Sequence, residues 1–127
     1  MKFIASDNLP QAIGPYSPAV KVNGMIYTSA QVPVTLDGTV VERNIKIQTR
    51  QVLSNLRTLL EDAESGMDKV VKVSIYLENI EDFGIVNVLF SEAFGDHKPA
   101  RSTVSVKGLP KNSMIMVEAI ALANDYR

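Results

Sequence analysis

The stretch that most constrains the fold lies near the C-terminal end of the chain. Residues 98–106 and residues 114–121 both alternate with a period of two, which is typical of β-strands. The link between them, residues 107–113, contains glycine, proline and asparagine, which favour turns. The pattern therefore predicts a closing β-hairpin.

A hairpin folded symmetrically about Leu109 and Pro110 would set Arg101 directly opposite Glu118. Opposed side chains on one sheet face lie close enough to interact. On the residues alone, the pair is as readily a structural ion pair as a functional site. A slip of one residue in the register would send the two charges to opposite faces.

Upstream of this stretch the periodicity alternates between strand and helix. The expected strands are residues 1–5, two strands within 19–29 around the turn dipeptide Asn23-Gly24, and 70–77. Apolar residues at three- and four-residue steps predict helices over 44–65 and 80–94. Asn44 is suited to begin the first helix and Gly66 to end it. The other segments, 6–17, 31–44 and 96–99, are expected to be loops, with a turn at Asp37-Gly38.

This order of elements predicts an α+β fold, in which two helices cover one face of a mixed β-sheet, and a single domain over residues 1–127. The opposite face would then carry the apolar side chains of Met114, Met116 and Ile120 beside Arg101 and Glu118. An exposed apolar patch of that kind marks an interface. The sequence therefore predicts an oligomer, with the two charged residues near a subunit boundary.

The bulk composition excludes several function classes. The chain has 127 residues, 46% of them apolar, and a net charge of −1, so nothing electrostatic favours nucleic acid or an anionic membrane. The absence of cysteine excludes disulfides and thiol chemistry and fits a reducing compartment. No apolar run is long enough for a signal peptide or a membrane span. We expect a cytoplasmic protein.

Motifs for known chemistry are sparse. There is no phosphate-binding glycine loop and no zinc-protease motif. His97, the only histidine, lies in a polar loop and is expected at the surface, and no set of metal ligands is present. Arg101 is a better candidate, because a guanidinium presents a planar fork that suits a carboxylate. For Tyr16 a packed turn aromatic, and for Asn87 an exposed or backbone-bonded amide, are the favoured structural interpretations.

Six short motifs in order resemble one known family. They are Ala-Ile-Gly-Pro-Tyr-Ser (12–17), Ile-Tyr-Thr-Ser-Ala-Gln-Val-Pro (26–33), Arg-Gln-Val-Leu-Ser-Asn-Leu (50–56), Pro-Ala-Arg-Ser (99–102), Leu-Pro (109–110) and Val-Glu-Ala-Ile-Ala (117–121). Their order and spacing resemble the reactive intermediate deaminases (Rid, or YjgF-like proteins), and the RidA branch in particular. The likeness extends from about residue 5 to residue 121.

The resemblance implies a chorismate-mutase-like homotrimer with three clefts between subunits. It also implies a hydrolase of amino-acid metabolism that detoxifies reactive enamines and imines. Such an enzyme converts 2-aminoacrylate-type intermediates, such as 2-iminobutanoate and 2-iminopropanoate, to 2-keto acids and ammonia. No cofactor and no metal would be needed.

Carried onto this chain, the resemblance assigns Arg101 to the substrate carboxylate, Glu118 to the attacking water, and the Thr103 backbone to the imine nitrogen. Further cleft residues would be Tyr16, Ser29 and Asn87. At two positions the chain departs from the family pattern. Ala30 stands where the family has glycine, and Thr103 stands where many members have cysteine, so substrate range is the property these two residues would alter.

Two other functions stay open. Some relatives are described as single-strand endoribonucleases or translation inhibitors, but the weak acidity of this chain and the lack of a paired acid and base disfavour that activity. The third possibility is a non-enzymatic binder of small carboxylates that uses the same clefts. Arg101 serves both a binder and a deaminase, whereas Glu118 beside the ligand favours hydrolysis.

Overall fold

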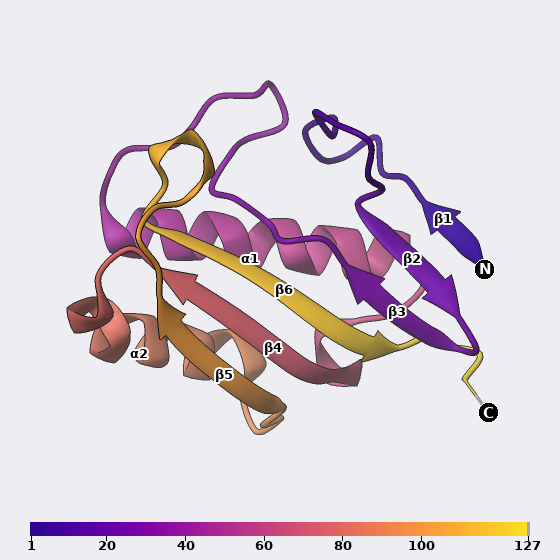
Figure 1. The fold of residues 1–127 in the computed structure, drawn as a ribbon. Coiled ribbons are helices and arrows are strands. Elements are labelled where there is room, and N and C mark those ends of the chain that lie inside the picture. Colours follow the sequence, from indigo (N-terminus) through magenta and orange to yellow (C-terminus); the bar gives the residue numbers. More distant parts are fainter. Residues whose placement is uncertain (127) are drawn as a thin grey trace.

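The computed structural model describes residues 1–126 and contains one six-stranded sheet with two α-helices behind it (Figure 1). This arrangement confirms the predicted α+β fold with both helices on one face. Three short 3₁₀ helices lie between the other elements. The elements in order are β1 (Lys2–Ile4), β2 (Ala19–Val22), β3 (Met25–Thr28), α1 (Ile45–Asp62), η1 (Met67–Lys69), β4 (Val70–Leu77), η2 (Ile80–Asp82), α2 (Phe83–Phe94), β5 (Ala100–Ser105), η3 (Pro110–Asn112) and β6 (Ile115–Leu122).

The sheet order is β1-β2-β3-β6-β4-β5, and this order makes the predicted closing hairpin wrong. β4 lies between β5 and β6, parallel to the former and antiparallel to the latter. Alternation reports that a segment is a strand but not which strand it pairs with. The link between β5 and β6 is long enough to cross over β4, and it turns through Lys111 and Asn112, which both have positive φ.

The first hairpin follows the prediction. β2 and β3 are joined by Asn23 and Gly24, with φ of 52° and 74°. Two consecutive positive φ angles are what the tight turn between twisted strands requires. β1 then pairs with β2 at the edge of the sheet.

α1 begins as predicted, because the Asn44 side chain accepts hydrogen bonds from the backbone N–H groups of Lys46 and Ile47 at 3.0 and 3.1 Å. Its end differs from the prediction. The helix ends at Asp62, and the chain reverses at Glu64, whose φ is 61°. Gly66 has an extended backbone and precedes η1, so it is not the helix cap. The second predicted helix also divides, into η2 and then α2.

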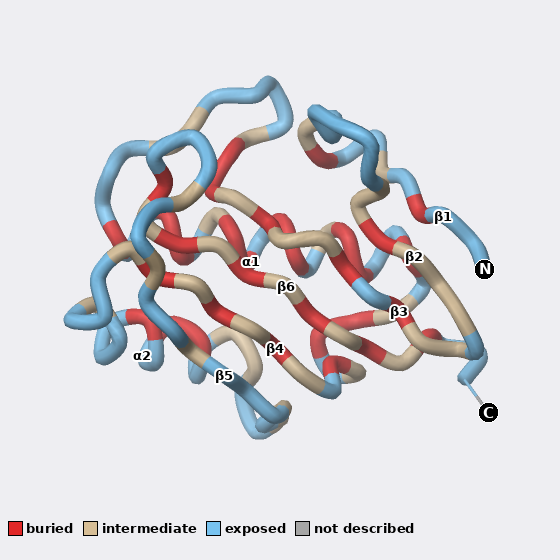
Figure 2. The backbone as a smooth tube through the Cα atoms, in the orientation of Figure 1, coloured by how far each residue is buried: buried red, intermediate tan, exposed pale blue. Residues whose placement is uncertain are grey.

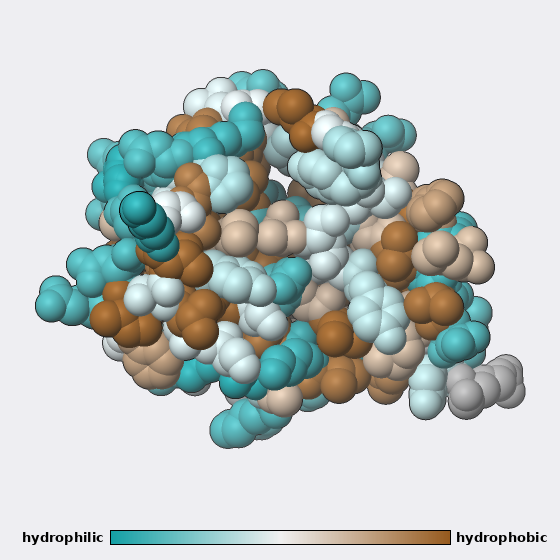
Figure 3. All heavy atoms as spheres, viewed as in Figure 1, coloured by the Kyte–Doolittle hydropathy of each residue, from teal (hydrophilic) through white to brown (hydrophobic). Residues whose placement is uncertain are grey.

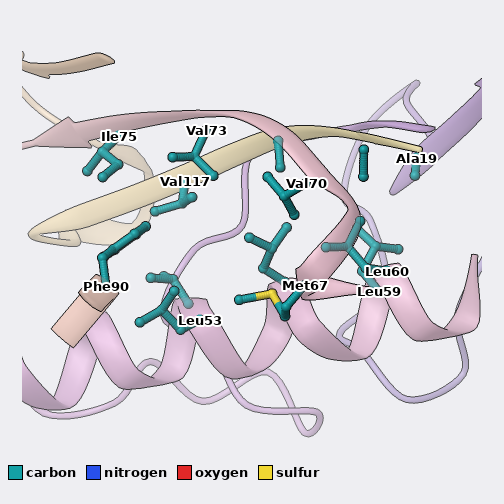
Figure 4. Packing of buried hydrophobic residues seen from close by; sticks show 14 of the residues in the cluster. Ala19, Leu53, Leu59, Leu60, Met67, Val70, Val73, Ile75, Phe90 and Val117 are labelled. Carbon is teal, nitrogen blue, oxygen red and sulfur yellow. The ribbon is translucent and has the colours of Figure 1, made fainter. Parts of the chain in front are cut away.

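The core fills the space between the sheet and the helices (Figure 4). Buried side chains of α1 such as Leu56 and Leu60 belong to one core cluster with Val73 and Ile75 of β4 and Val117 of β6. Along β6, buried and half-buried residues alternate without exception, so one face of the central strands is in the core and the other is not (Figure 2).

The face of the sheet opposite the helices is left uncovered, as predicted. Figure 3 shows apolar and polar side chains mixed on this face. By strand register it carries Tyr27, Lys72, Tyr76, Met116 and Glu118. Met114, expected here, packs against the core instead.

Within residues 1–126, no helix is long and apolar enough to cross a membrane.

Candidate functional site

Arg101 and Glu118, the two residues predicted to face each other, lie on opposite faces of the sheet. Arg101 is in register with Val73, which is buried on the helix side. Glu118 is in register with Ser74, whose side chain points the other way. Since β4 separates the two strands, their backbones are also about 10 Å apart. The expected direct pairing, and the expected position of Arg101 on the uncovered face, are therefore wrong.

The structure instead sorts the predicted site residues into two groups. We call Asn87, Arg101 and Thr103 the Arg101 cluster. We call Tyr16, Ser29, Ala30 and Glu118 the Glu118 cluster. Each group is brought together by different elements, and β4 lies between them.

In the Arg101 cluster, the guanidinium carbon of Arg101 stands 5.3 Å from the ring centroid of Phe83, at the start of α2. This distance is within the range of a cation–π contact. Arg101 is exposed, as is Asn87 one helical turn along α2, in agreement with the exposed interpretation of that amide. Both line an open hollow of about 470 Å³, together with Val73, Phe90 and Lys98.

Backbone groups add to this cluster, because β5 is an edge strand. The Val106 N–H donates to the Leu77 carbonyl at 2.8 Å. In a parallel ladder alternate residues bond to the same neighbour, so the N–H and C=O groups of Arg101 and Thr103 point to the open edge. The Thr103 hydroxyl is buried and has no hydrogen-bond partner among the described residues. The cluster thus offers a cation and free amide groups side by side.

His97 borders the same hollow but is half-buried rather than fully at the surface. Its Nε2 lies 2.7 Å from the Val70 carbonyl oxygen. The imidazole ring therefore forms a structural contact that joins the loop before β5 to the start of β4.

In the Glu118 cluster, a bulge between β3 and β6 surrounds the carboxylate. Gln31 and Val117 exchange two backbone hydrogen bonds, at 2.7 and 3.1 Å. On the other side of Glu118, the Ala119 N–H donates to the Thr28 hydroxyl at 2.9 Å. Two residues, Ser29 and Ala30, therefore span the position opposite the single residue Glu118, which is the geometry of a β-bulge.

The loop that carries Tyr16 is attached to this bulge. The Ser29 hydroxyl donates to the Ser17 carbonyl at 2.6 Å, and the Ser29 N–H donates to the Pro18 carbonyl at 2.8 Å. Tyr16 itself is 55% exposed, so the packed interpretation of this tyrosine is wrong. Its position places an exposed aromatic ring on the loop next to the bulge.

Ala30 fits the bulge without backbone strain. The non-glycine residues with positive φ among residues 1–126 are Asn23, Glu64, Lys111 and Asn112, so Ala30 does not occupy the left-handed region that would favour glycine. The methyl group of Ala30 therefore does not strain the conformation of the chain.

One contact in this cluster was not anticipated from the sequence. The Tyr76 hydroxyl of β4 donates a hydrogen bond of 2.5 Å to Oε1 of Glu118. This bond raises the pKa of the Tyr76 phenol above its usual value, and partial burial and the negative charge of Glu118 act in the same direction. The sequence offered one signal, the alternation along β4, which puts Tyr76 on the face opposite the buried residues. That signal could not point to Glu118 until β4 was known to pair with β6.

Chemically, the first cluster can bind a carboxylate and the second can hold water. A fixed guanidinium with adjacent amide groups suits a small anion, and a half-buried carboxylate with one oxygen engaged can accept a proton with the other. No three His, Asp or Glu side chains within residues 1–126 lie close enough together to hold a metal ion.

The whole of this framework matches a known protein family. The family model described as "Endoribonuclease L-PSP" matches residues 6–123, and the chain therefore belongs to this family, that of the YjgF-like or Rid proteins. This finding confirms the resemblance recognised from the six motifs.

Three relatives indicate the range of the family. A Lactococcus lactis protein named as a candidate regulator, AldR, is 46% identical over 95% of this chain and 97% of its own length. The Escherichia coli protein named 2-iminobutanoate/2-iminopropanoate deaminase is 39% identical over 95% of this chain and 97% of its own. Among solved structures, E. coli TdcF with bound serine superposes with a TM-score of 0.91, at 30% identity, over 98% of this chain and all of that one.

Proposed function

We propose that this protein is a deaminase that hydrolyses reactive 2-imino acids, and the enamines from which they form, to 2-keto acids and ammonia. The substrate class is that of 2-iminopropanoate and 2-iminobutanoate, and neither a cofactor nor a metal takes part. The names of relatives 38% and 39% identical to this chain support this activity.

The observation that carries the proposal is the setting of Arg101. Its guanidinium is exposed, rests on the Phe83 ring and lies beside the free edge of β5. A substrate carboxylate would accept two parallel hydrogen bonds from this fork. The imine nitrogen, two bonds from the carboxylate carbon, would then reach the backbone of Thr103 on the same edge.

Because Arg101 and Glu118 of one chain lie on opposite faces of the sheet, we propose that each site is completed by a second copy of the chain. The Arg101 cluster of one subunit would face the Glu118 cluster of the next. The uncovered apolar face and the free β5 edge are the surfaces that such an assembly would cover. A closed ring of three subunits would contain three equivalent sites.

In the reaction, a water molecule held by Glu118 attacks C2 of the imine, and the π electrons of the C=N bond move to nitrogen. Glu118 accepts a proton from the water and returns it to the nitrogen, which gives a neutral intermediate with a hydroxyl and an amino group on C2. Glu118 then takes the hydroxyl proton and passes it to the amino group as the C–N bond breaks, so that ammonia and the 2-keto acid leave and the carboxylate is regenerated. Since an imine is already electrophilic, holding carboxylate, imine and water in line supplies much of the acceleration.

A second candidate is a binder of small carboxylates, favoured by the regulator name of the L. lactis relative and by the serine bound to TdcF. The family description favours RNA cleavage as a third, but the net charge of −1 offers little attraction for a polyanion.

One assay separates these functions. 2-Aminoacrylate is generated in situ by a serine dehydratase, and the rate of pyruvate appearance is followed with and without this protein. We expect acceleration by the wild type and none by Arg101→Ala. If the wild type binds the ligand but leaves the rate unchanged, the protein is a binder, and RNA cleavage that persists after repurification would support the nuclease.

A further inference from the structure

The hydroxyl of Tyr76 forms a direct contact with the carboxylate assigned to water. It lies 2.5 Å from Oε1 of Glu118, and both side chains are half-buried on the uncovered face of the sheet. Tyr76 is not in direct register with Glu118, which pairs with Ser74. The phenol therefore reaches diagonally across the strand pair to make this bond.

The contact has two chemical consequences. A glutamate side chain has three rotatable bonds, and a bond from a donor fixed on a neighbouring strand removes much of that freedom. With Oε1 occupied by the phenol, Oε2 is the oxygen left to receive a proton. Tyr76 thus selects both the direction and the reactive oxygen of the carboxylate.

The donor stays available over the working range of pH. Because the hydrogen bond and the charge of Glu118 raise the pKa of Tyr76, the phenol keeps its proton to higher pH than a free tyrosine. It therefore acts as a hydrogen-bond donor throughout and not as a second base.

The other groups around Glu118 do not duplicate this role. Lys72 of β4 is a charged residue on the same face, and its Nζ donates to the Ser102 hydroxyl of β5 at 3.1 Å, away from β6. Tyr27 of β3 is in register with Ile120. The bulge residues Ser29 and Ala30 have no titratable side chain.

From this geometry we propose that Tyr76 is a positioning residue for hydrolysis, which holds the Glu118 carboxylate aimed at the attacking water. The inference rests on the proposed deaminase function. It differs from a structural role for Tyr76, because it requires that the hydroxyl act through Glu118 alone.

The test compares four variants of the full-length chain in the 2-aminoacrylate assay: Tyr76→Phe, Glu118→Gln, the double variant, and Tyr27→Phe as the matched control on the same face. We expect Tyr76→Phe to lower kcat about tenfold, the value of a hydrogen bond to a charged group, with KM unchanged because Arg101 still binds the carboxylate. Tyr27→Phe should match the wild type.

The double variant separates positioning from structure. If Tyr76 acts through Glu118, adding Tyr76→Phe to Glu118→Gln should cost almost nothing more. Equal, independent losses in both backgrounds would overturn the inference, as would a Tyr76→Phe variant whose kcat equals that of the wild type. If the wild type itself fails to accelerate the reaction, the deaminase proposal is wrong, and the role proposed for Tyr76 is wrong for the same reason. The elution volume of each variant establishes that the assembly is unchanged.

Discussion

The Arg101 cluster and the Glu118 cluster are built in different ways. Around Glu118, the bulge, the Tyr16 loop and β4 are tied by short hydrogen bonds, among them Ser29 to the Ser17 carbonyl at 2.6 Å and Tyr76 to Glu118 at 2.5 Å. Around Arg101, the one specific side-chain contact described is the Phe83 ring, and the strand beneath it is an open edge.

This difference fits the role proposed for each group. A carboxylate that accepts a proton needs a fixed direction, and the interior of a sheet supplies one. A guanidinium keeps its charge in any environment, so it can stand exposed, and in the proposed assembly a ligand and a second subunit would cover it. Substitutions near Arg101 should therefore affect activity alone, whereas substitutions that support Glu118 should affect stability as well.

The largest effect is expected from Arg101→Ala. Loss of the carboxylate clamp should lower kcat/KM about 100-fold or more, because the imine is no longer held against the water. The side chain is exposed, so the thermal midpoint should stay at the wild-type value. Arg101→Lys, which keeps the charge without the fork, should give an intermediate rate. A large fall in thermal midpoint for Arg101→Ala would contradict the proposed contrast.

A mixing experiment tests whether the two clusters meet between subunits. Arg101→Ala and Glu118→Gln are each expected to be inactive. When the two variants are unfolded together and refolded, about one quarter of the sites in a closed ring should combine an intact Arg101 with an intact Glu118. Recovery of activity in the mixture, and none when the variants are refolded separately, is the expected outcome. An inactive mixture that contains mixed assemblies by mass spectrometry would exclude shared sites.

Asn55→Ala should destabilise the Glu118 side. The buried Asn55 amide of α1 donates to the Val32 and Val34 carbonyls, both at 3.0 Å, and so holds the segment that follows the bulge. Removing it takes one donor from each carbonyl, although the Val32 carbonyl still accepts from the Val34 N–H at 2.8 Å. The loss should cost about 2 kcal/mol of unfolding free energy.

The matched control for that loss is Asn87→Ala, an exposed amide in the Arg101 cluster. It should change unfolding free energy by less than about 0.5 kcal/mol. Both are measured by urea denaturation at one protein concentration, since assembly contributes to stability. Equal destabilisation by the two variants would show that the clusters are supported alike.

The smallest effect is expected from Phe83→Leu, which removes the aromatic face under Arg101 but keeps an apolar side chain. A cation–π contact at an exposed site is weak, so KM should rise roughly threefold with kcat unchanged. Val88→Ala, an exposed apolar residue on the same helix, is the control and should leave KM unaltered. A fall in kcat for Phe83→Leu would indicate that the ring positions more than the clamp.

Local patterns were sufficient to predict most elements of this fold. The spacing of apolar residues indicated α1 and β4, and the Asn23-Gly24 dipeptide indicated the β2–β3 hairpin. Both signals act over a few neighbouring residues. The motifs around Arg101 and Glu118 indicated the family, and the matching of residues 6–123 confirmed it.

Pairing over long distances was decided by the tertiary structure. Nothing in the alternating residues of β5 and β6 shows that β4 lies between them, because a strand's period fixes its faces but not its neighbours. Because β4 lies between β5 and β6, Arg101 is on the helix side of the sheet and Glu118 is on the uncovered face. The same pairing brings the Tyr76 hydroxyl within 2.5 Å of the Glu118 carboxylate. The sequence by itself determined which residues we propose for the chemistry. The order of strands in the sheet decided which of them can meet within one chain, and for Arg101 and Glu118 it decided that they cannot.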